Sequence, residues 1–339
     1  MSRFICDAHV HSVRFAAKFT EKGEVPDYLT LQERISTWEP YDNSAALLWE
    51  MDRYGVDMAI CNSAFNMRNE IIADQVKRHP GKLLGFCSWA ECRRRGTVEE
   101  DYRVTGDMMA EEVEKWLDEP GFVGVGEGVL WVPGKGNTTQ FDTWEQTLPH
   151  VAKVLEVCAE RDVPIVFHVG FSRYSWGPRS SLKWCDPFLV DELACYFPKV
   201  NIIIWMEGMV GWYNYFIEKA AMVTARHDNV YLIPVAPGHV LEKLYQNPNI
   251  GPEKLIFGSD FGASHSYQRL ADGKVYGVWP NKPPTHLVHH MAWGLEQIHK
   301  VEMPEEHREM ILGLNIARLC KIDVKKRLRE ERKKYERNP

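Results

Sequence analysis

"RFICDAHVH" (3–11) is an apolar run near the start of the chain that ends in two histidines, His9 and His11. Residues i and i+2 of a strand share a face, so the run predicts a strand whose two imidazoles point the same way. The pair alone is weak evidence, because 13 His in 339 residues give roughly 0.5 H-x-H triplets by chance. Whether the pair binds a metal depends on further ligand residues elsewhere in the chain.

Seven further apolar runs follow, and amphipathic segments such as "GDMMAEEVEKWLDE" (106–119) separate them. The runs are "VDMAICN" (56–62), "LLGFCSW" (83–89), "GFVGVGEG" (121–128), "VPIVFHVG" (163–170), "VNIIIWME" (200–207), "NVYLIPV" (229–235) and "KLIFGSD" (254–260). Eight strands alternating with helices predict an α/β fold, a single (β/α)8 TIM-like barrel with loops inserted on its catalytic face and a C-terminal helical extension. A doubly wound open sheet is the alternative, but no G-x-G-x-x-G motif follows the first run.

The bulk composition is that of an ordinary globular protein, with 45% hydrophobic and 26% charged residues and a net charge of −6. We expect one barrel domain at 1–322 and a charged helix or tail at 323–339. No apolar stretch approaches a signal sequence or the roughly 18 residues of a membrane span. The basic residues form no patch that would suit nucleic acid.

The eight cysteines contain no C-x-x-C pair, and Cys6, Cys61 and Cys87 fall in or beside strand-like runs, which predicts buried free thiols in a reducing cytoplasm.

Polar residues fall where such a barrel places its chemistry, at the carboxyl ends of the strands. His168 follows the apolar residues of the fifth run, and Asp260 ends the eighth. Alone, His168 is typical of a core histidine and Asp260 of a helix N-cap. Together with His9 and His11 they suit one divalent metal with an open position for water, Zn²⁺ first and Mn²⁺ as the alternative.

Four stretches give the sequence a family resemblance: "DAHVH" (7–11), "FHVG" (167–170), "FGSDF" (257–261) and "LNIARLCKI" (314–322). From residue 4 to about 322 the chain resembles the amidohydrolase superfamily, in particular the amidohydrolase-related branch with decarboxylases and lactonases. The resemblance implies that His9, His11, His168 and Asp260 are metal ligands and that Asp260 also moves a proton. It implies a structural role for Asn315.

Two positions depart from the pattern of that branch. Met206 in "IIIWMEGMVG" (202–211) stands where the sixth strand typically carries a histidine, and a thioether is neither acid nor base, so we assign Met206 to substrate binding. Glu127 ends the fourth run, where the decarboxylases of the branch lack a glutamate and TatD-type nucleases carry one as a ligand. Glu127 is therefore a metal ligand, a catalytic base or a turn cap, and the sequence leaves all three open.

The segments after the strands hold further candidates. "FSRYSWGPRSSLKW" (171–184) reads as an aromatic and basic lid for a planar anionic substrate, and 12–40 is long enough to belong to the same lid. His265, after the eighth run, is a candidate catalytic residue. Arg93–Arg95 either hold a substrate carboxylate or form a solvated loop. His286, His289 and His290 form either a second metal site or a helix surface. The lid residues predicted to bind substrate are Arg173, Tyr174, Trp176 and Arg179.

Three functions fit these residues. The first is a cytoplasmic metal-dependent hydrolase, expected to be a homodimer, that cleaves a C–N or C–O bond (amide, lactone or ester) of a small anionic or aromatic molecule through a metal-activated water. The second is a non-oxidative decarboxylase of an aromatic or unsaturated acid, and the third is a non-catalytic relative that binds a ligand. Glu127 favours hydrolysis, because a second carboxylate helps to deprotonate water and opposes binding of a carboxylate at the metal. The partner is a small molecule, with no nucleic acid or membrane.

Overall fold

The computed structural model describes most of the chain. The described residues are 3–15, 37, 39–64, 66–170, 181–207, 214–262, 268–269, 275–276 and 290–326. The predicted lid residues Arg173, Tyr174, Trp176 and Arg179, together with His265, His286 and His289, lie outside them. Most of the expected C-terminal extension at 323–339 does so too.

A seven-stranded parallel sheet forms the centre of the molecule, in the order β1-β4-β5-β6-β9-β10-β11. Its strands coincide with the first seven predicted runs, because strands buried on both faces read as short apolar segments. Their bounds are Cys6–Val10 (β1), Met58–Asn62 (β4), Leu83–Cys87 (β5), Phe122–Gly128 (β6), Ile165–Val169 (β9), Ile202–Glu207 (β10) and Val230–Val235 (β11).

The eighth run closes the sheet between its two edges. Leu255 forms a parallel bridge with Leu232 of β11, and Phe261 forms one with Val10 of β1. The amide of Ile256 donates to the carbonyl of Leu232 at 3.0 Å, and the amide of Asp260 donates to that of His9 at 2.9 Å. The fold is therefore the predicted TIM-like barrel and not a doubly wound open sheet.

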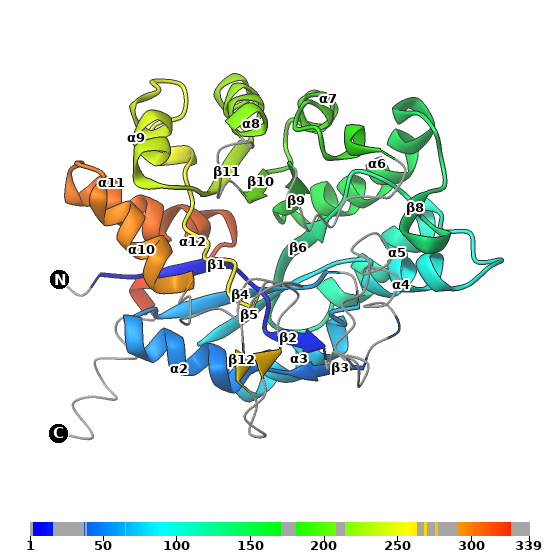
Figure 1. The fold of residues 1–339 in the computed structure, drawn as a ribbon, viewed down its shortest axis with the longest axis horizontal. Coiled ribbons are helices and arrows are strands. Elements are labelled where there is room, and N and C mark those ends of the chain that lie inside the picture. Colours follow the sequence, from blue (N-terminus) through cyan, green and yellow to red (C-terminus); the bar gives the residue numbers. More distant parts are fainter. Residues whose placement is uncertain are drawn as a thin grey trace.

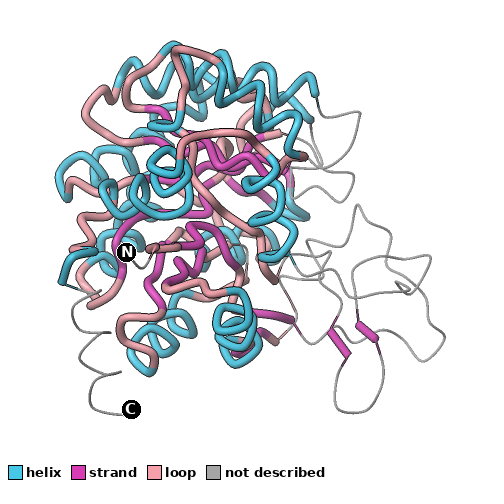
Figure 2. Tube along the Cα trace, turned by 90° about the vertical axis from the view of Figure 1, so that its left-hand side faces the viewer, coloured by secondary structure: helices cyan, strands magenta, loops and turns pink. Residues whose placement is uncertain are grey.

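Helices surround this barrel, as two perpendicular views show (Figures 1 and 2). Their bounds are Ser44–Tyr54 (α2), Asn69–Arg78 (α3), Ala90–Val98 (α4), Gly106–Leu117 (α5), Trp144–Arg161 (α6), Phe188–Tyr196 (α7), Asn214–Arg226 (α8), Gly238–Gln246 (α9), His290–Lys300 (α10), Glu305–Glu309 (α11) and Asn315–Leu319 (α12). Short helical turns lie at Lys135–Asn137 (η1), Leu182–Cys185 (η2), Pro252–Lys254 (η3) and Met310–Leu314 (η4, a π-helix). Three small antiparallel pairs complete the described structure: Val13–Phe15 (β2) with Pro40–Asp42 (β3), Pro133–Gly134 (β7) with Thr138–Thr139 (β8), and Gln268–Arg269 (β12) with Val275–Tyr276 (β13).

Local sequence signals begin and end these helices. Helix α6 starts with a capping box, in which Thr143 accepts from the amide of Gln146 and the Gln146 side chain accepts from the amide of Thr143. It ends at Asp162 in the left-handed conformation, with φ of 49°. Its apolar face is buried at Val151 and Leu155. Such faces form the outer core between sheet and helices.

A second, smaller core fills the barrel with side chains such as Ile60, Phe86, Val166, Ile203 and Ile233. All five are fully buried. At the amino-terminal end of the eighth strand segment, Asn315 donates to the carbonyls of Pro252 and Leu255. These contacts hold α12 against that end of the barrel. None of the helices within the described ranges combines the length and apolar character needed to cross a membrane.

Gly262, at the end of the eighth strand segment, lies against the backbone of His11, the residue after β1. A Cβ at Gly262 would lie 1.9 Å from the carbonyl oxygen of His11, and the residue has φ of +83°. We expect Gly262→Ala to lower the free energy of unfolding by about 2–5 kcal/mol, from left-handed strain plus overpacking. Gly55→Ala is the matched control, because Gly55 has φ of +69° with no atom near its Cβ position, and strain alone should cost about 1–2 kcal/mol. If urea unfolding showed the same loss of unfolding free energy for Gly262→Ala and Gly55→Ala, the close contact between Gly262 and His11 would be contradicted.

The eight cysteines supply a second test of the fold. Cys6, Cys61 and Cys87 are fully buried, and burial raises the pKa of Cys61 to about 12 and that of Cys87 well above its ordinary value. Cys195 is the exposed cysteine. A thiol reagent without denaturant should therefore label about one thiol per chain quickly, because thiolate and access set the rate. Cys195→Ser should remove that reaction, and rapid labelling of Cys6, Cys61 or Cys87 would contradict the strand assignments.

Candidate functional site

Two β-bulges turn site residues into the mouth of the barrel. Between the pairs Asp7↔Ala59 and Val10↔Cys61, strand β1 has two residues where β4 has one, and the second of them is His9. Strand β6 has the same irregularity. Between the pairs Val125↔Ile165 and Gly128↔Phe167, β6 has two residues, Gly126 and Glu127, where β9 has one. A bulge re-aims side chains without ending the strand. The extra residue in each strand sets the direction in which the side chains of His9 and Glu127 point.

The side chains of His9, His11, Glu127 and Asp260 meet at the carboxyl ends of the strands. Oε2 of Glu127 lies 3.3 Å from Nε2 of His9 and 3.3 Å from Nε2 of His11. Oδ1 of Asp260 lies 3.8 Å and 3.5 Å from the same two nitrogens. The other Glu127 oxygen, Oε1, lies 2.5 Å from Nδ1 of His168. Two carboxylates therefore face one pair of imidazoles.

Burial and mutual contact set the charges of these groups. Burial on its own raises the pKa of Glu127, but the imidazoles of His168, His11 and His9 outweigh it and hold that pKa well below its usual value. Burial lowers the pKa of His9 to about 4, against the opposing effect of Glu127. Glu127 is therefore an anion at neutral pH, and His9 is a neutral base.

The donor set fits a divalent metal. His11 lies with Nδ1 3.3 Å from the carbonyl oxygen of Asn62, which can only accept, so Nδ1 carries a proton and Nε2 is the nitrogen that is left to face the carboxylates. Nε2 of His11 lies 3.3 Å from an oxygen of Glu127 and 3.5 Å from an oxygen of Asp260, an arrangement of nitrogen and carboxylate donors that suits a divalent cation. Ligand atoms of His9, His11 and Asp260 all lie within 4.8 Å of one another. His168 joins this group through Glu127, so three of the four predicted ligands form the cluster directly.

Sequence comparison identifies the family. A family model described as amidohydrolase matches residues 6–322. The chain belongs to the amidohydrolase family. The match spans nearly the whole chain and confirms the resemblance carried by the sequence motifs. No curated protein is similar enough in sequence to give a match.

Solved structures share the fold of this amidohydrolase at low sequence identity. A 5-carboxyvanillate decarboxylase from Sphingomonas paucimobilis has a TM-score of 0.54 at 14% identity, over 95% of this chain and 100% of that one. A probable 2-pyrone-4,6-dicarboxylic acid hydrolase from Acinetobacter baumannii, with citric acid bound, has a TM-score of 0.54 at 11% identity, over 94% and 99%. An amidohydrolase from Bifidobacterium longum subsp. infantis has 0.51 at 12% identity, over 95% and 100%. At these identities the likeness shows the fold alone.

Trp205 is a site residue of this amidohydrolase that sequence reasoning missed. It pairs with His168 across β10 and β9, and its ring stacks on His9 at 4.6 Å between centroids and meets His168 at 4.4 Å. Met206, which we assigned to substrate binding, is not brought to the site: it is buried in the outer core against Gly170. The side chain that faces the imidazoles from the sixth barrel strand is an indole.

Asp7 and Asp260 fix the backbone around the cluster. Oδ1 of Asp7 accepts from the amides of Ser259 at 2.9 Å and His9 at 3.2 Å, which ties β1 to the eighth strand segment. Asp260 has φ of 59°, a left-handed conformation that aspartate tolerates better than most residues. The sequence signal for this anchor is an aspartate that stands inside an apolar run, two residues before His9.

The three arginines after β5 separate in the structure. Arg94 binds Glu91 at 2.6 Å, and Arg95 binds Glu99 at 2.8 Å, both on the outside of α4. Arg93 is buried, with its guanidinium carbon 5.1 Å from the centroid of the Trp131 ring. Arg94 and Arg95 are therefore solvated, but all three arginines lie on helix α4, so the expectation of a loop at this position is wrong.

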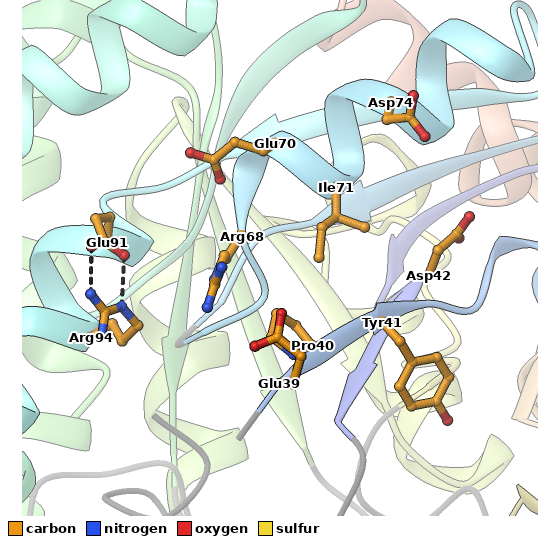
Figure 3. A pocket seen from close by; sticks show the side chains of 10 residues that line it. All are labelled: Glu39, Pro40, Tyr41, Asp42, Arg68, Glu70, Ile71, Asp74, Glu91 and Arg94. Atoms are coloured by element: carbon orange, nitrogen blue, oxygen red, sulfur yellow. Dashed lines mark hydrogen bonds and ion pairs between the residues drawn. The ribbon is translucent and has the colours of Figure 1, made fainter. Parts of the chain in front are cut away.

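A cleft of about 890 Å³ opens between β3, α3 and α4 (Figure 3). Several of the charged side chains that line it are already paired, with Glu91 bound to Arg94 and both Asp42 and Asp74 bound to Arg78. None of the imidazoles of the cluster lines it. The buried cluster, and not this cleft, is the candidate site.

Proposed function

We propose that this amidohydrolase is a metal-dependent hydrolase that cleaves an amide, lactone or ester bond of a small molecule. The observation that carries the proposal is the pair of carboxylates, Glu127 and Asp260, each within 4 Å of both His9 and His11. Hydrolysis needs a group that takes a proton from water and a group that returns one to the leaving atom. Asp260 can meet both needs in turn, while Glu127 remains an anion beside the imidazoles.

The donors that would hold the metal are His9, His11 and Asp260, with His168 beside them. When bound, a divalent cation would polarise the scissile carbonyl and lower the pKa of water. Glu127 is ionised and accepts the Nδ1 proton of His168, which leaves Nε2 as the ring nitrogen of His168 that could face a metal. Trp205 covers His9 with its ring and keeps water from that side of the imidazole.

Asp260 is our candidate for proton transfer. Its carboxylate lies at the end of the eighth strand segment, held by the hydrogen bond from its own amide to the carbonyl of His9. We propose that Asp260 takes the proton of the attacking water and passes it to the nitrogen or oxygen of the leaving group. Glu127 stays ionised through its contacts with three imidazoles, so it orients His168 and sets the charge of the site.

Decarboxylation is the second candidate, since one of the structures with this fold is named a decarboxylase. In that reaction the carboxylate to be lost would have to lie at the cluster, beside the anions of Glu127 and Asp260. Like charges at that spacing raise the cost of binding it. The two carboxylates therefore favour hydrolysis.

A substrate screen with metal control tests the proposal. Zn²⁺-loaded protein is incubated with lactones, amides and aromatic carboxylic acids, and acid release and CO₂ release are followed in parallel. We expect acid release from a lactone or amide, its loss on chelation and its return with added Zn²⁺. CO₂ evolution from a hydroxybenzoate-like acid, with Glu127→Gln fully active, would overturn the hydrolase assignment.

A further inference from the structure

The three imidazoles of the cluster are held in two different ways. Nδ1 of His11 lies 3.3 Å from the carbonyl oxygen of Asn62. Nδ1 of His168 lies 2.5 Å from Oε1 of Glu127. Nδ1 of His9 is buried and has no hydrogen-bond partner among the residues that the structure describes. Because a histidine that binds a metal normally donates its second ring N–H to an acceptor, His9 lacks the contact that orients the other two rings.

The indole of Trp205 lies on the face of the His9 ring instead. The two rings are stacked, with 4.6 Å between their centroids and 17° between their planes. Trp205 lies on β10 and His9 on β1, and β11 and the eighth strand segment separate these two strands in the barrel. The indole therefore reaches across the barrel interior, where only 2% of it is exposed.

The packing around the stacked pair is tight. Trp205 lies between His168 and Ile233, its partners on β9 and β11. A Cβ at Gly258, on the eighth strand segment, would lie 2.7 Å from Cγ2 of Ile233 and 2.9 Å from Cβ of His9. Since Gly258 carries no side chain, β1 and β11 come together beside it. The packing thus fixes the plane of the His9 ring, although no hydrogen bond from Nδ1 does so.

A stacked indole stabilises a metal-bound imidazole more than a free one. An imidazole that donates its lone pair to a cation loses electron density and becomes partly positive. The face of an indole is negative, and it attracts positive charge more strongly than the face of phenylalanine or tyrosine. Stacking on Trp205 therefore favours the metal-bound state of His9, with Nε2 directed at Glu127 and Asp260.

We propose that Trp205 is a positioning residue of the metal site, whose indole face orients His9 in place of the missing hydrogen bond and raises the affinity of the cluster for a divalent cation. The inference rests on the metal site of the proposed function and not on the reaction, because cation binding is measured without turnover. It makes the aromatic face, and not the indole N–H, the part of Trp205 that acts on the site.

Titration of metal-free protein with Zn²⁺ against a competing chelator tests the inference. We expect Trp205→Leu to raise the Kd for Zn²⁺ about 10- to 100-fold, the usual cost of losing a residue that orients a ligand. Trp205→Phe keeps an aromatic face without the N–H, so it should raise the Kd only about 2- to 5-fold.

Trp116→Leu is the matched control for the loss of a buried indole. Trp116 is buried in the outer core on α5, where its ring packs on that of Phe122 at 5.9 Å between centroids. This variant should lose stability, as Trp205→Leu does, and keep the wild-type Kd for Zn²⁺. The comparison separates the orientation of His9 from a general loss of stability.

Visible absorption of the Co²⁺-loaded protein gives a second readout, because the d–d bands report the geometry of the ligands around the ion. The bands of Trp205→Phe and Trp116→Leu should match those of wild type, and the bands of Trp205→Leu should shift. A role of Trp205 in stability alone would lower the Tm of Trp205→Leu and leave its bands unchanged.

Each remaining outcome counts against a stated part of the argument. Wild-type Zn²⁺ affinity in Trp205→Leu, or equal losses in Trp205→Leu and Trp205→Phe, would overturn the inference and leave the proposed function standing. If Trp205→Leu fails to fold, by circular dichroism, an unchanged Kd in Trp205→Phe would overturn it. No Zn²⁺ binding by wild type would overturn both. Zn²⁺ affinity that depends on Trp205, with no hydrolysis of any screened substrate, would contradict the proposed function alone.

Discussion

Asp260→Asn is expected to lower kcat by about 10²-fold or more while the protein stays folded, because an amide cannot accept a proton. The substitution keeps the size of the side chain, and asparagine, like aspartate, tolerates the left-handed backbone found at this residue. The loss should therefore be chemical and not structural. Three measurements on the variant separate the possible causes. Turnover of the best substrate from the screen reports the chemical step, thermal unfolding reports the fold, and metal content reports the role of Asp260 as a ligand.

Asp162→Asn is the matched control for this experiment. Asp162 also has a left-handed backbone, with φ of 49°, but it lies at the end of α6 with an exposed side chain bound to Lys321. The same substitution in the same conformation should leave kcat unchanged. If Asp260→Asn retained a rate near wild type with its metal in place, Asp260 would have no part in the proton transfer.

The barrel could be predicted from the sequence because its determinants are local. Buried parallel strands read as short apolar runs, and the seven strands of the sheet match such runs within a few residues. The positions of His9, His11, Glu127, His168 and Asp260 follow from the same pattern, since each lies at the end of a predicted strand or within two residues of it. Where a strand ends, the chain enters the face on which such barrels hold their chemistry.

The direction of individual side chains could not be predicted in the same way. The bulges before His9 and Glu127 each add one residue to one strand, and nothing in the composition marks them. The sixth barrel strand shows the same limit, because a shift of one residue moves a side chain to the other face. The resemblance to the family pattern puts the site position at Met206, whereas the pairing with His168 puts Trp205 there.

The role of Glu127 illustrates why contacts between distant segments escape a sequence reading. Ligand, base and turn cap were all open, since each fits a glutamate at the end of a strand. In the structure its two oxygens contact three imidazoles that come from β1, the residue after β1, and β9. Arg93 is a similar case, because the sequence offers it together with Arg94 and Arg95, and only its buried position on α4 separates it from them.

Metal content gives the second large expected effect. Protein purified without chelator should carry about one divalent metal per chain, Zn²⁺ by preference, since the donor set is imidazole and carboxylate. His9→Ala should lose most of it, because Nε2 of His9 lies at the centre of the cluster, within 4 Å of both carboxylates. The control is His239→Ala on the exposed side of α9, which should retain the metal in full. Elemental analysis of the three proteins, each dialysed against the same buffer, measures the difference.

The same metal should stabilise the fold, because the strands that carry its ligands meet only in the folded chain. A ligand that binds the folded state alone adds about 4 kcal/mol at a free concentration 1,000 times its Kd. Removing it with a chelator leaves Glu127 and Asp260 facing His9 and His11 without the central charge, so we expect a lower Tm for wild type and no change for His9→Ala. Full metal retention by His9→Ala, or a wild-type Tm indifferent to chelation and to added Zn²⁺, would show that this cluster does not hold the metal.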